Sequence, residues 1–178
     1  VPSREYEDAK MRKDLALAPS SASSGSPWIP TGDPMVDGVG PGSWTPRRDA
    51  PELDAHGHVK IRPMSMLDDF KVSAGRDPRG KVVVGGDGEV AGRVTDMWVD
   101  VPEALVRFLT IDVNPEGSGK TRLIPMNMAR ILPDRVVVRS LHASNWDNVP
   151  TTKSKEQVTL LEEEKIMAYY GGGPLSAS

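Results

Sequence analysis

The sequence predicts a mainly β protein: a small antiparallel barrel or sandwich that follows a long extended segment and precedes one C-terminal helix. Residues 58–141 contain short β-branched runs separated by turn signals, which is the pattern of an all-β domain. Residues 1–50 show no sustained period of 2 or 3.6, and a helical pattern appears only after Pro150. These observations predict the order extended segment, barrel, helix.

Composition narrows the class of protein. The 178 residues include 16 prolines and 17 glycines, which favours one compact domain with much loop. The 22 basic and 25 acidic residues give a net charge of -3, so the positive field of a nucleic-acid binder is missing. There is no cysteine, which excludes disulfides and thiolate zinc sites. The longest apolar runs are far shorter than the roughly 20 residues that span a bilayer.

The barrel region is predicted from alternating apolar residues and from turns. The turn Gly85-Gly86-Asp87-Gly88 is expected to supply the positive φ angles of a tight hairpin. Leu109, Ile111 and Val113 alternate with polar residues, as in a half-buried strand. The expected strands cover residues 82–84, 90–99, 109–113, 122–126 and 135–139.

A helix is predicted over residues 160–170. Thr159 and Glu162 have the spacing of a capping box, in which each side chain satisfies a free backbone N–H of the other residue. Glu162, Glu163 and Glu164 lie in the first turn, where the helix dipole favours anions. The glycines at 171–173 are expected to end the helix.

Asp54, His56 and His58 form the first candidate site. At spacings i, i+2 and i+4 in an extended segment, the three side chains would point to the same side. Two imidazoles and a carboxylate can bind a divalent metal, or can gather and pass protons near neutral pH. From spacing alone, a pair of exposed histidines near a turn is the favoured interpretation, because a catalytic metal usually needs a third strong ligand and the only other histidine is His142.

Asp100, Glu103 and Arg107 form the second candidate site, at the connection between two predicted strands. Pro102 bends the chain between the two carboxylates, which repel each other when both are ionised, so one pKa rises. A nearby arginine lowers that pKa again, and the balance can place a proton acceptor near the operating pH. A solvated acidic turn with a stabilising arginine explains the same spacing.

Other catalytic signatures are missing. The stretch Gly117-Ser-Gly-Lys-Thr121 resembles part of a phosphate-binding loop, but its first glycine is replaced by Asn114 and a strand follows it instead of a helix. The sequence has no Gly-x-Ser-x-Gly elbow and no Gly-x-Gly-x-x-Gly fingerprint. We therefore predict that the chain is not an enzyme.

The order of several motifs resembles one known family, the H subunits of purple-bacterial photosynthetic reaction centres. The resemblance extends over about residues 30–173. Its motifs are PTGDPM at 30–35, DGVGP at 37–41, RDAPELDAHGH at 48–58, KIRPM at 60–64, AGRVTDMWVD at 91–100, RFL at 107–109, LIPM at 123–126 and VTLLEEEKIMAYYG at 158–171.

The resemblance implies a domain organisation. The family's cytoplasmic domain is a PRC-barrel, a small antiparallel β-barrel, preceded by a transmembrane helix and a connecting segment. We expect residues 1–29 to be flexible or extended and residues 30–57 to form an arm that lies on partner subunits. The barrel is expected over residues 58–150, and the C-terminal helix and tail over residues 151–178. The transmembrane helix is absent from this sequence, so we expect the partners to hold the chain at the membrane.

The resemblance also implies a function. Such a subunit caps the L and M subunits on the cytoplasmic face of the photosynthetic membrane, stabilises the complex and conducts protons to the secondary quinone. Asp54, His56 and His58 resemble the surface cluster where protons enter and where transition metals can bind. Asp100, Glu103 and Arg107 resemble the interior relay and its charge partner.

Partners and cofactors follow from the same resemblance. L and M are the expected partners, together with membrane lipid headgroups; light-harvesting complex 1 and a cytochrome subunit are further candidates, and nucleic acid is not expected. Bacteriochlorophyll, bacteriopheophytin, quinones and non-haem iron would all be held by L and M, and none by this chain. Two alternatives are a soluble PRC-barrel adaptor or assembly module, and an enzyme with a hydrolytic metal site at Asp54, His56 and His58.

Overall fold

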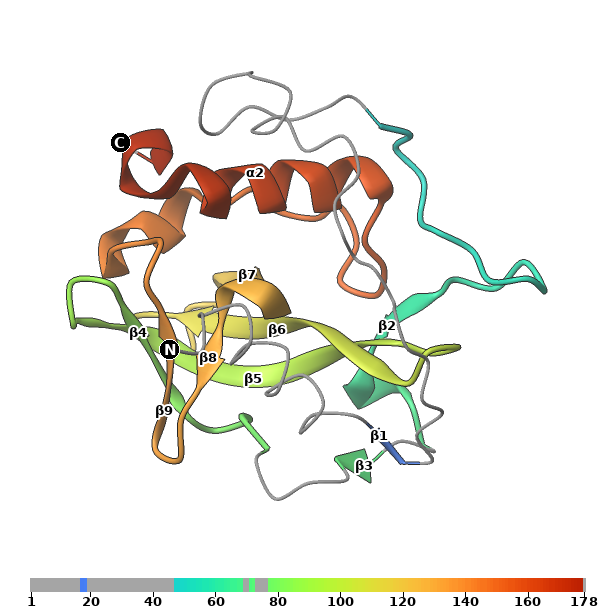
Figure 1. The fold of residues 1–178 in the computed structure, drawn as a ribbon, viewed down its shortest axis with the longest axis horizontal. Coiled ribbons are helices and arrows are strands. Elements are labelled where there is room, and N and C mark those ends of the chain that lie inside the picture. Colours follow the sequence, from blue (N-terminus) through green and yellow to red (C-terminus); the bar gives the residue numbers. More distant parts are fainter. Residues whose placement is uncertain (1–16, 19–46, 69–70, 73–76, 178) are drawn as a thin grey trace, which may run out of the picture.

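The computed structural model of the chain describes residues 17–18, 47–68, 71–72 and 77–177 (Figure 1). The predicted segment 1–29, apart from residues 17–18, and residues 30–46 of the predicted arm lie outside the described residues. Among the described residues, no helix is long and apolar enough to cross a bilayer.

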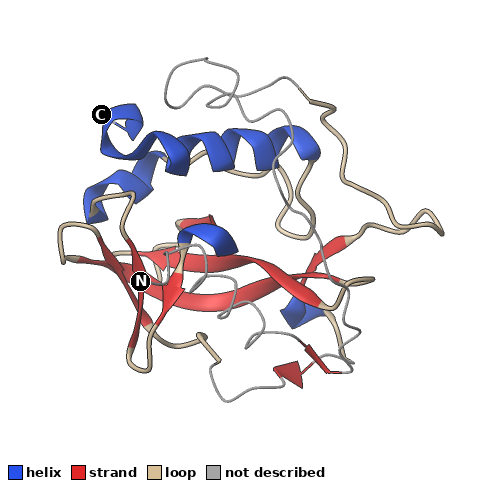
Figure 2. Cartoon of the chain, viewed as in Figure 1, coloured by secondary structure: helices blue, strands red, loops and turns tan. Residues whose placement is uncertain are grey.

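The described chain is mainly β, with one long helix (Figure 2). The main sheet has the strand order β7-β6-β5-β4-β9-β8, and β2 also pairs with β5. A separate short pair joins β1 (Leu17–Ala18) to β3 (Lys71–Val72). The strands of the main sheet are β2 (Ile61–Pro63), β4 (Val82–Gly85), β5 (Val90–Asp100), β6 (Leu105–Val113), β7 (Thr121–Pro125), β8 (Arg130–Ile131) and β9 (Arg135–Val138).

The long strand β5 curls the sheet into a half-barrel. Its register with β6 shifts between Val94 and Asp96 and again between Trp98 and Val99. Each shift marks a bulge or irregularity, which bends a strand and increases its twist. One edge of β5 therefore pairs with β4 near Gly92 and with β2 near Asp100. The pairing of β2 with β5 positions residues of the candidate site.

The predicted strands are confirmed, with two corrections. All ladders of the main sheet are antiparallel except β4–β9, which is parallel. Of the turn glycines at 85, 86 and 88, only Gly88 has a positive φ, 80°. Gly85 and Gly86 are needed for space instead, because an added Cβ would lie 2.7 Å from the Leu141 carbonyl oxygen and 2.4 Å from that of Arg139.

The helix α2 (Leu160–Ala177) lies over one face of the sheet (Figure 1). The predicted capping box is confirmed: the Glu162 N–H donates to Thr159 Oγ1 at 3.1 Å, and the Thr159 N–H donates to Glu162 Oε1 at 2.9 Å. The helix continues beyond its predicted end at residue 170 and is broken by a kink at Gly173, where φ is 63°.

The hydrophobic core fills the space between α2 and the sheet. Ile124 of β7, Ile166 and Tyr170 of α2 and Trp146 have no exposed surface. Trp146 belongs to η3 (Ala143–Asn148), one of the 3-10 helices of the described residues; the others are η1 (Met64–Met66) and η2 (Met126–Met128). Its ring packs edge-on against Tyr170, with centroids 6.3 Å apart. This packing holds α2 across β7 and η3 and so fixes where its acidic first turns lie.

Candidate functional site

The first candidate site lies on a tight turn closed by an antiparallel bridge between Leu53 and Val59. Asp54 Oδ1 accepts hydrogen bonds from the backbone N–H groups of His56 at 2.8 Å and His58 at 2.9 Å. The segment is therefore a turn with two exposed histidines, which is the alternative that the spacing left open, and not the extended segment that the same-side argument assumed. The three residues still lie together, because the carboxylate organises the backbone of the turn around itself.

The side chains of this turn differ in exposure. The His58 side chain is 78% exposed and its Nδ1 lies 3.8 Å from Oδ2 of Asp54, whose side chain is 18% exposed. The His56 and His58 ring centroids are 6.4 Å apart. The backbone hydrogen bond from His58 is the main cause that lowers the pKa of Asp54. Within the described ranges, no group of three His, Cys, Asp or Glu side chains is placed to hold a metal ion.

The second candidate site surrounds Asp100, the last residue of β5. Its side chain is 2% exposed, and Oδ2 lies 3.2 Å from Nη1 of Arg107 on β6. Oδ1 accepts the backbone N–H of Glu103 at 3.2 Å, across the turn that joins β5 to β6. Burial raises the pKa of Asp100, against the opposing effects of Lys60, the Glu103 N–H and Arg107. The three predicted residues therefore do lie together.

Lys60 connects the two candidate sites. Its ammonium lies 3.5 Å from Oδ2 of Asp100 and 3.6 Å from Oε2 of Glu52. The pairing of β2 with β5 produces this contact, since Ile61 is opposite Asp100 and the Lys60 carbonyl accepts the N–H of Val101. The surface turn thus leads within two residues to the cation that faces the buried carboxylate.

Glu163 on α2 completes the interior cluster. Its Oε1 lies 3.6 Å from Nη2 of Arg107, and its side chain is 13% exposed. Burial raises the pKa of Glu163 to about 7. Oε2 of Glu163 and Oε2 of Glu103 are both buried without a hydrogen-bond partner among the described residues. We call the set Glu52, Lys60, Asp100, Glu103, Arg107 and Glu163 the interior cluster.

Three members of the interior cluster were not predicted as site residues. Lys60 and Glu52 flank the motif that contains Asp54, and only the strand pairing reveals their place. Glu163 was predicted only as an acid of the first helical turn. No spacing relates residue 163 to residue 107, so only the packing of α2 on the sheet brings Glu163 to Arg107.

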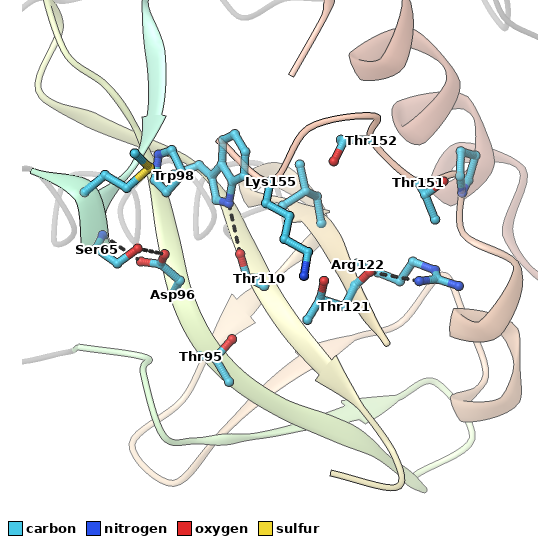
Figure 3. A pocket seen from close by; sticks show the side chains of 14 residues that line it. Ser65, Thr95, Asp96, Trp98, Thr110, Thr121, Arg122, Thr151, Thr152 and Lys155 are labelled. Carbon is cyan, nitrogen blue, oxygen red and sulfur yellow. Dashed lines mark hydrogen bonds between the residues drawn. The ribbon is translucent and has the colours of Figure 1, made fainter. Parts of the chain in front are cut away.

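A separate hollow of about 350 Å³ lies beside β5, β6 and β7 (Figure 3). Several of its polar side chains have partners: Ser65 donates to Asp96, and Trp98 Nε1 donates to Thr110 Oγ1 at 2.9 Å. Arg122 donates to two backbone carbonyls. None of the six predicted site residues lines this hollow. We therefore place the candidate site at the interior cluster and the surface turn.

Comparison with known families agrees with the motifs. Residues 1–66 match the family described as "Photosynthetic reaction centre, H-chain N-terminal region". Residues 70–144 match the "PRC-barrel domain". The two matches follow each other in the order that the motifs predicted.

The chain belongs to the reaction-centre H-chain family. Membership makes it a component of the reaction-centre complex, which implies L and M partners. H chains are in general non-catalytic subunits, and no cofactor site is evident on the described part of this one. The PRC-barrel match also agrees with the observed curled half-barrel and single C-terminal helix.

Proposed function

We propose that this H chain caps the L and M subunits on the cytoplasmic side and conducts protons from the cytoplasm toward the secondary quinone. One observation carries the proposal: the exposed turn of Asp54, His56 and His58 runs directly into Lys60, whose ammonium faces the buried carboxylate of Asp100. An exposed pair of imidazoles is thereby linked, through Lys60, to a buried carboxyl group that can receive protons.

The chemistry of the quinone explains why such a relay is needed. A doubly reduced quinone is a dianion, and burying two negative charges in a medium of low dielectric constant is very costly. Protons must therefore arrive together with the second electron. Arg107 and Lys60 limit the cost of the buried negative charge at Asp100, and the unpartnered Oε2 of Glu103 is available to bind a proton.

The location and partners belong to the same proposal. We assign residues 30–57 to an arm on L and M, residues 58–150 to the barrel and residues 151–178 to the helix and tail. Contact with L, M and lipid headgroups then holds the chain at the cytoplasmic face of the photosynthetic membrane. Pigments, quinones and iron stay in L and M, and light-harvesting complex 1 and a cytochrome subunit are further candidate partners.

The relay is tested by Glu103→Gln in the assembled complex. This change keeps the shape of the side chain but removes its titrating group. We expect the second electron transfer to the quinone, followed by flash spectroscopy, to slow roughly tenfold or more, as expected when a positioned acid-base group is lost. Glu156→Gln, at an exposed glutamate outside the cluster, is the matched control. Unchanged proton-uptake kinetics in the Glu103 variant would exclude this relay.

The surface turn is tested with zinc. We propose that the exposed imidazoles of His56 and His58 turn to bind a divalent metal together with Asp54, which blocks proton uptake. Replacing both histidines by alanine should abolish the inhibition of proton uptake by added zinc. The control is His142→Ala, because His142 is the remaining histidine of the sequence. Persistent inhibition in the double variant would place the metal and the proton entrance elsewhere.

A further inference from the structure

The carboxyl group of Glu163 lies in the interior cluster, although Glu163 is more than 50 residues away from Arg107 in the sequence. We propose that Glu163 is a proton-binding member of the relay, and that it shares Arg107 with Asp100 so that the charges of the two carboxyls are coupled. This inference rests on the proposed function and adds to it a third proton-binding carboxyl, on α2.

The sharing follows from the geometry of Arg107. Nη1 of its guanidinium lies 3.2 Å from Oδ2 of Asp100, and Nη2 lies 3.6 Å from Oε1 of Glu163. The Arg107 side chain is 20% exposed and the two carboxylates are 2% and 13% exposed, so water screens the three charges weakly. One cation therefore stands between two buried anions.

The other charged groups around Glu163 do not all favour the same protonation state of its carboxyl group. Glu52 raises its pKa, whereas Arg47 and Lys60 from the same N-terminal segment and Arg107 from β6 lower it. Arg47 is engaged elsewhere, since its Nη1 lies 3.3 Å from Oε1 of Glu164. Burial outweighs these cations and raises the pKa of Glu163 to about 7. The group is therefore divided between its two protonation states at the pH of a cytoplasm.

The coupling has a defined direction. When Glu163 binds a proton, its negative charge disappears and Arg107 no longer divides its attraction between the two carboxylates, so Asp100 holds its own proton less tightly. When Glu163 releases the proton, one O–H bond breaks there and one forms on an accepting carboxylate or water. No electron moves in this step. A proton held on α2 thus favours the ionised form of Asp100 and promotes release of a proton from it.

The test is a carboxyl titration of the full chain labelled with ¹³C at the glutamate Cδ and aspartate Cγ atoms, followed by NMR. We expect one glutamate carboxyl to titrate near pH 7. Its signal should be lost in Glu163→Gln and kept in Glu156→Gln, where an exposed glutamate is changed in the same way. In Glu163→Gln, the titration of Asp100, assigned with Asp100→Asn, should move to lower pH.

Each outcome decides a part of the inference. If no glutamate of the wild-type chain titrates above about pH 6, Glu163 is an ordinary carboxylate and the inference fails, whether or not the variant folds. If the signal near pH 7 survives in Glu163→Gln, it belongs to another residue. If Asp100 titrates unchanged in that variant, Arg107 does not couple the two groups. None of these results depends on electron transfer, so they are separate from the Glu103→Gln test of the proposed function.

Discussion

At the scale of single residues, Asp100 and Glu163 show how much the number of partners matters for a buried carboxyl. Asp100 faces two cations and a backbone N–H, at 3.2–3.5 Å. Glu163 faces one cation at 3.6 Å, and one of its oxygens is buried without a partner. Burial raises the pKa of both groups, and it raises the pKa of Glu163 to about 7.

The pKa of Glu163 predicts a pH dependence of stability. It rises from 4.5 in the unfolded chain to about 7 in the folded one, so the native state binds more protons between these pH values. The stabilisation is fully present below about pH 4.5 and is lost as the pH rises through 7, by about 3 kcal/mol in the free energy of unfolding. Urea denaturation at pH 5 and pH 8 measures this difference. In Glu163→Gln the drop should shrink by the same amount; an identical drop in both proteins would show that Glu163 does not cause it.

At the scale of elements, the start of α2 is held from several sides. Besides the capping box, Thr159 Oγ1 donates to Asp49 Oδ1 at 2.8 Å, and Glu162 Oε2 accepts the N–H of Lys153 at 2.8 Å. Thr159 is 6% exposed and Glu162 is 7% exposed. Because Glu163 follows at once, the same cap that starts the helix also orients the carboxyl that meets Arg107.

Thr159→Ala should therefore loosen the first turn of α2. The change removes the acceptor of the Glu162 N–H and the donor to Asp49, and loss of such a cap costs about 1–2 kcal/mol. Urea unfolding gives the total loss, and faster hydrogen exchange at the Glu162 amide gives its position. Thr159→Ser keeps the hydroxyl and should recover most of the stability. A loss as large in the serine variant would assign the effect to the missing methyl group instead.

Strand β5 is the element that joins the two parts of the candidate site. Its bulges let one edge pair with β4 at one end and with β2 at the other, and β2 delivers Lys60 to Asp100. Gly92 allows the close approach of β6, because an added Cβ would lie 2.1 Å from the Asp112 carbonyl oxygen. The curvature of the sheet is thus a condition for the contact between Lys60 and Asp100.

At the scale of the whole molecule, α2 is fastened to the barrel by two tyrosines. The hydroxyl of Tyr170 donates to the Leu123 carbonyl of β7 at 2.8 Å, and that of Tyr169 donates to the Asn145 carbonyl of η3 at 2.7 Å. Tyr170 has no exposed surface, whereas Tyr169 is partly exposed. Water can replace the second hydrogen bond but not the first.

Tyr170→Phe should therefore destabilise the chain more than Tyr169→Phe. We expect a loss of about 1–2 kcal/mol for Tyr170→Phe, because it removes a buried donor, and about 0.5 kcal/mol or less for Tyr169→Phe. Thermal or urea unfolding of the two variants side by side measures the difference. Equal losses would mean that water reaches the Tyr170 hydroxyl, and that α2 is less tightly docked than its packing indicates.

The sequence by itself determined the longer strands, the start of the helix and the family. These elements follow from local signals, which reflect local hydrogen bonding and burial. Examples are the alternation in residues 109–113, the turn before Val90 and the spacing of Thr159 and Glu162. The same is true of Asp100 and Glu103, which meet across one turn, and of Arg107, which follows it on the next strand. The order of the motifs identified the family. A long series of motifs in the same order is specific to one family, whereas the spacing of a single pair of residues is not.

Only the tertiary structure decided which charges meet. The parallel pairing of β4 with β9, the contact of Lys60 with Asp100 and the contact of Glu163 with Arg107 join residues about 40 to 60 positions apart. No local pattern encodes such contacts, because they depend on how a bulged strand curls and on where a helix packs. A buried pKa depends on the same packing, since burial outweighs every neighbouring charge at Glu163.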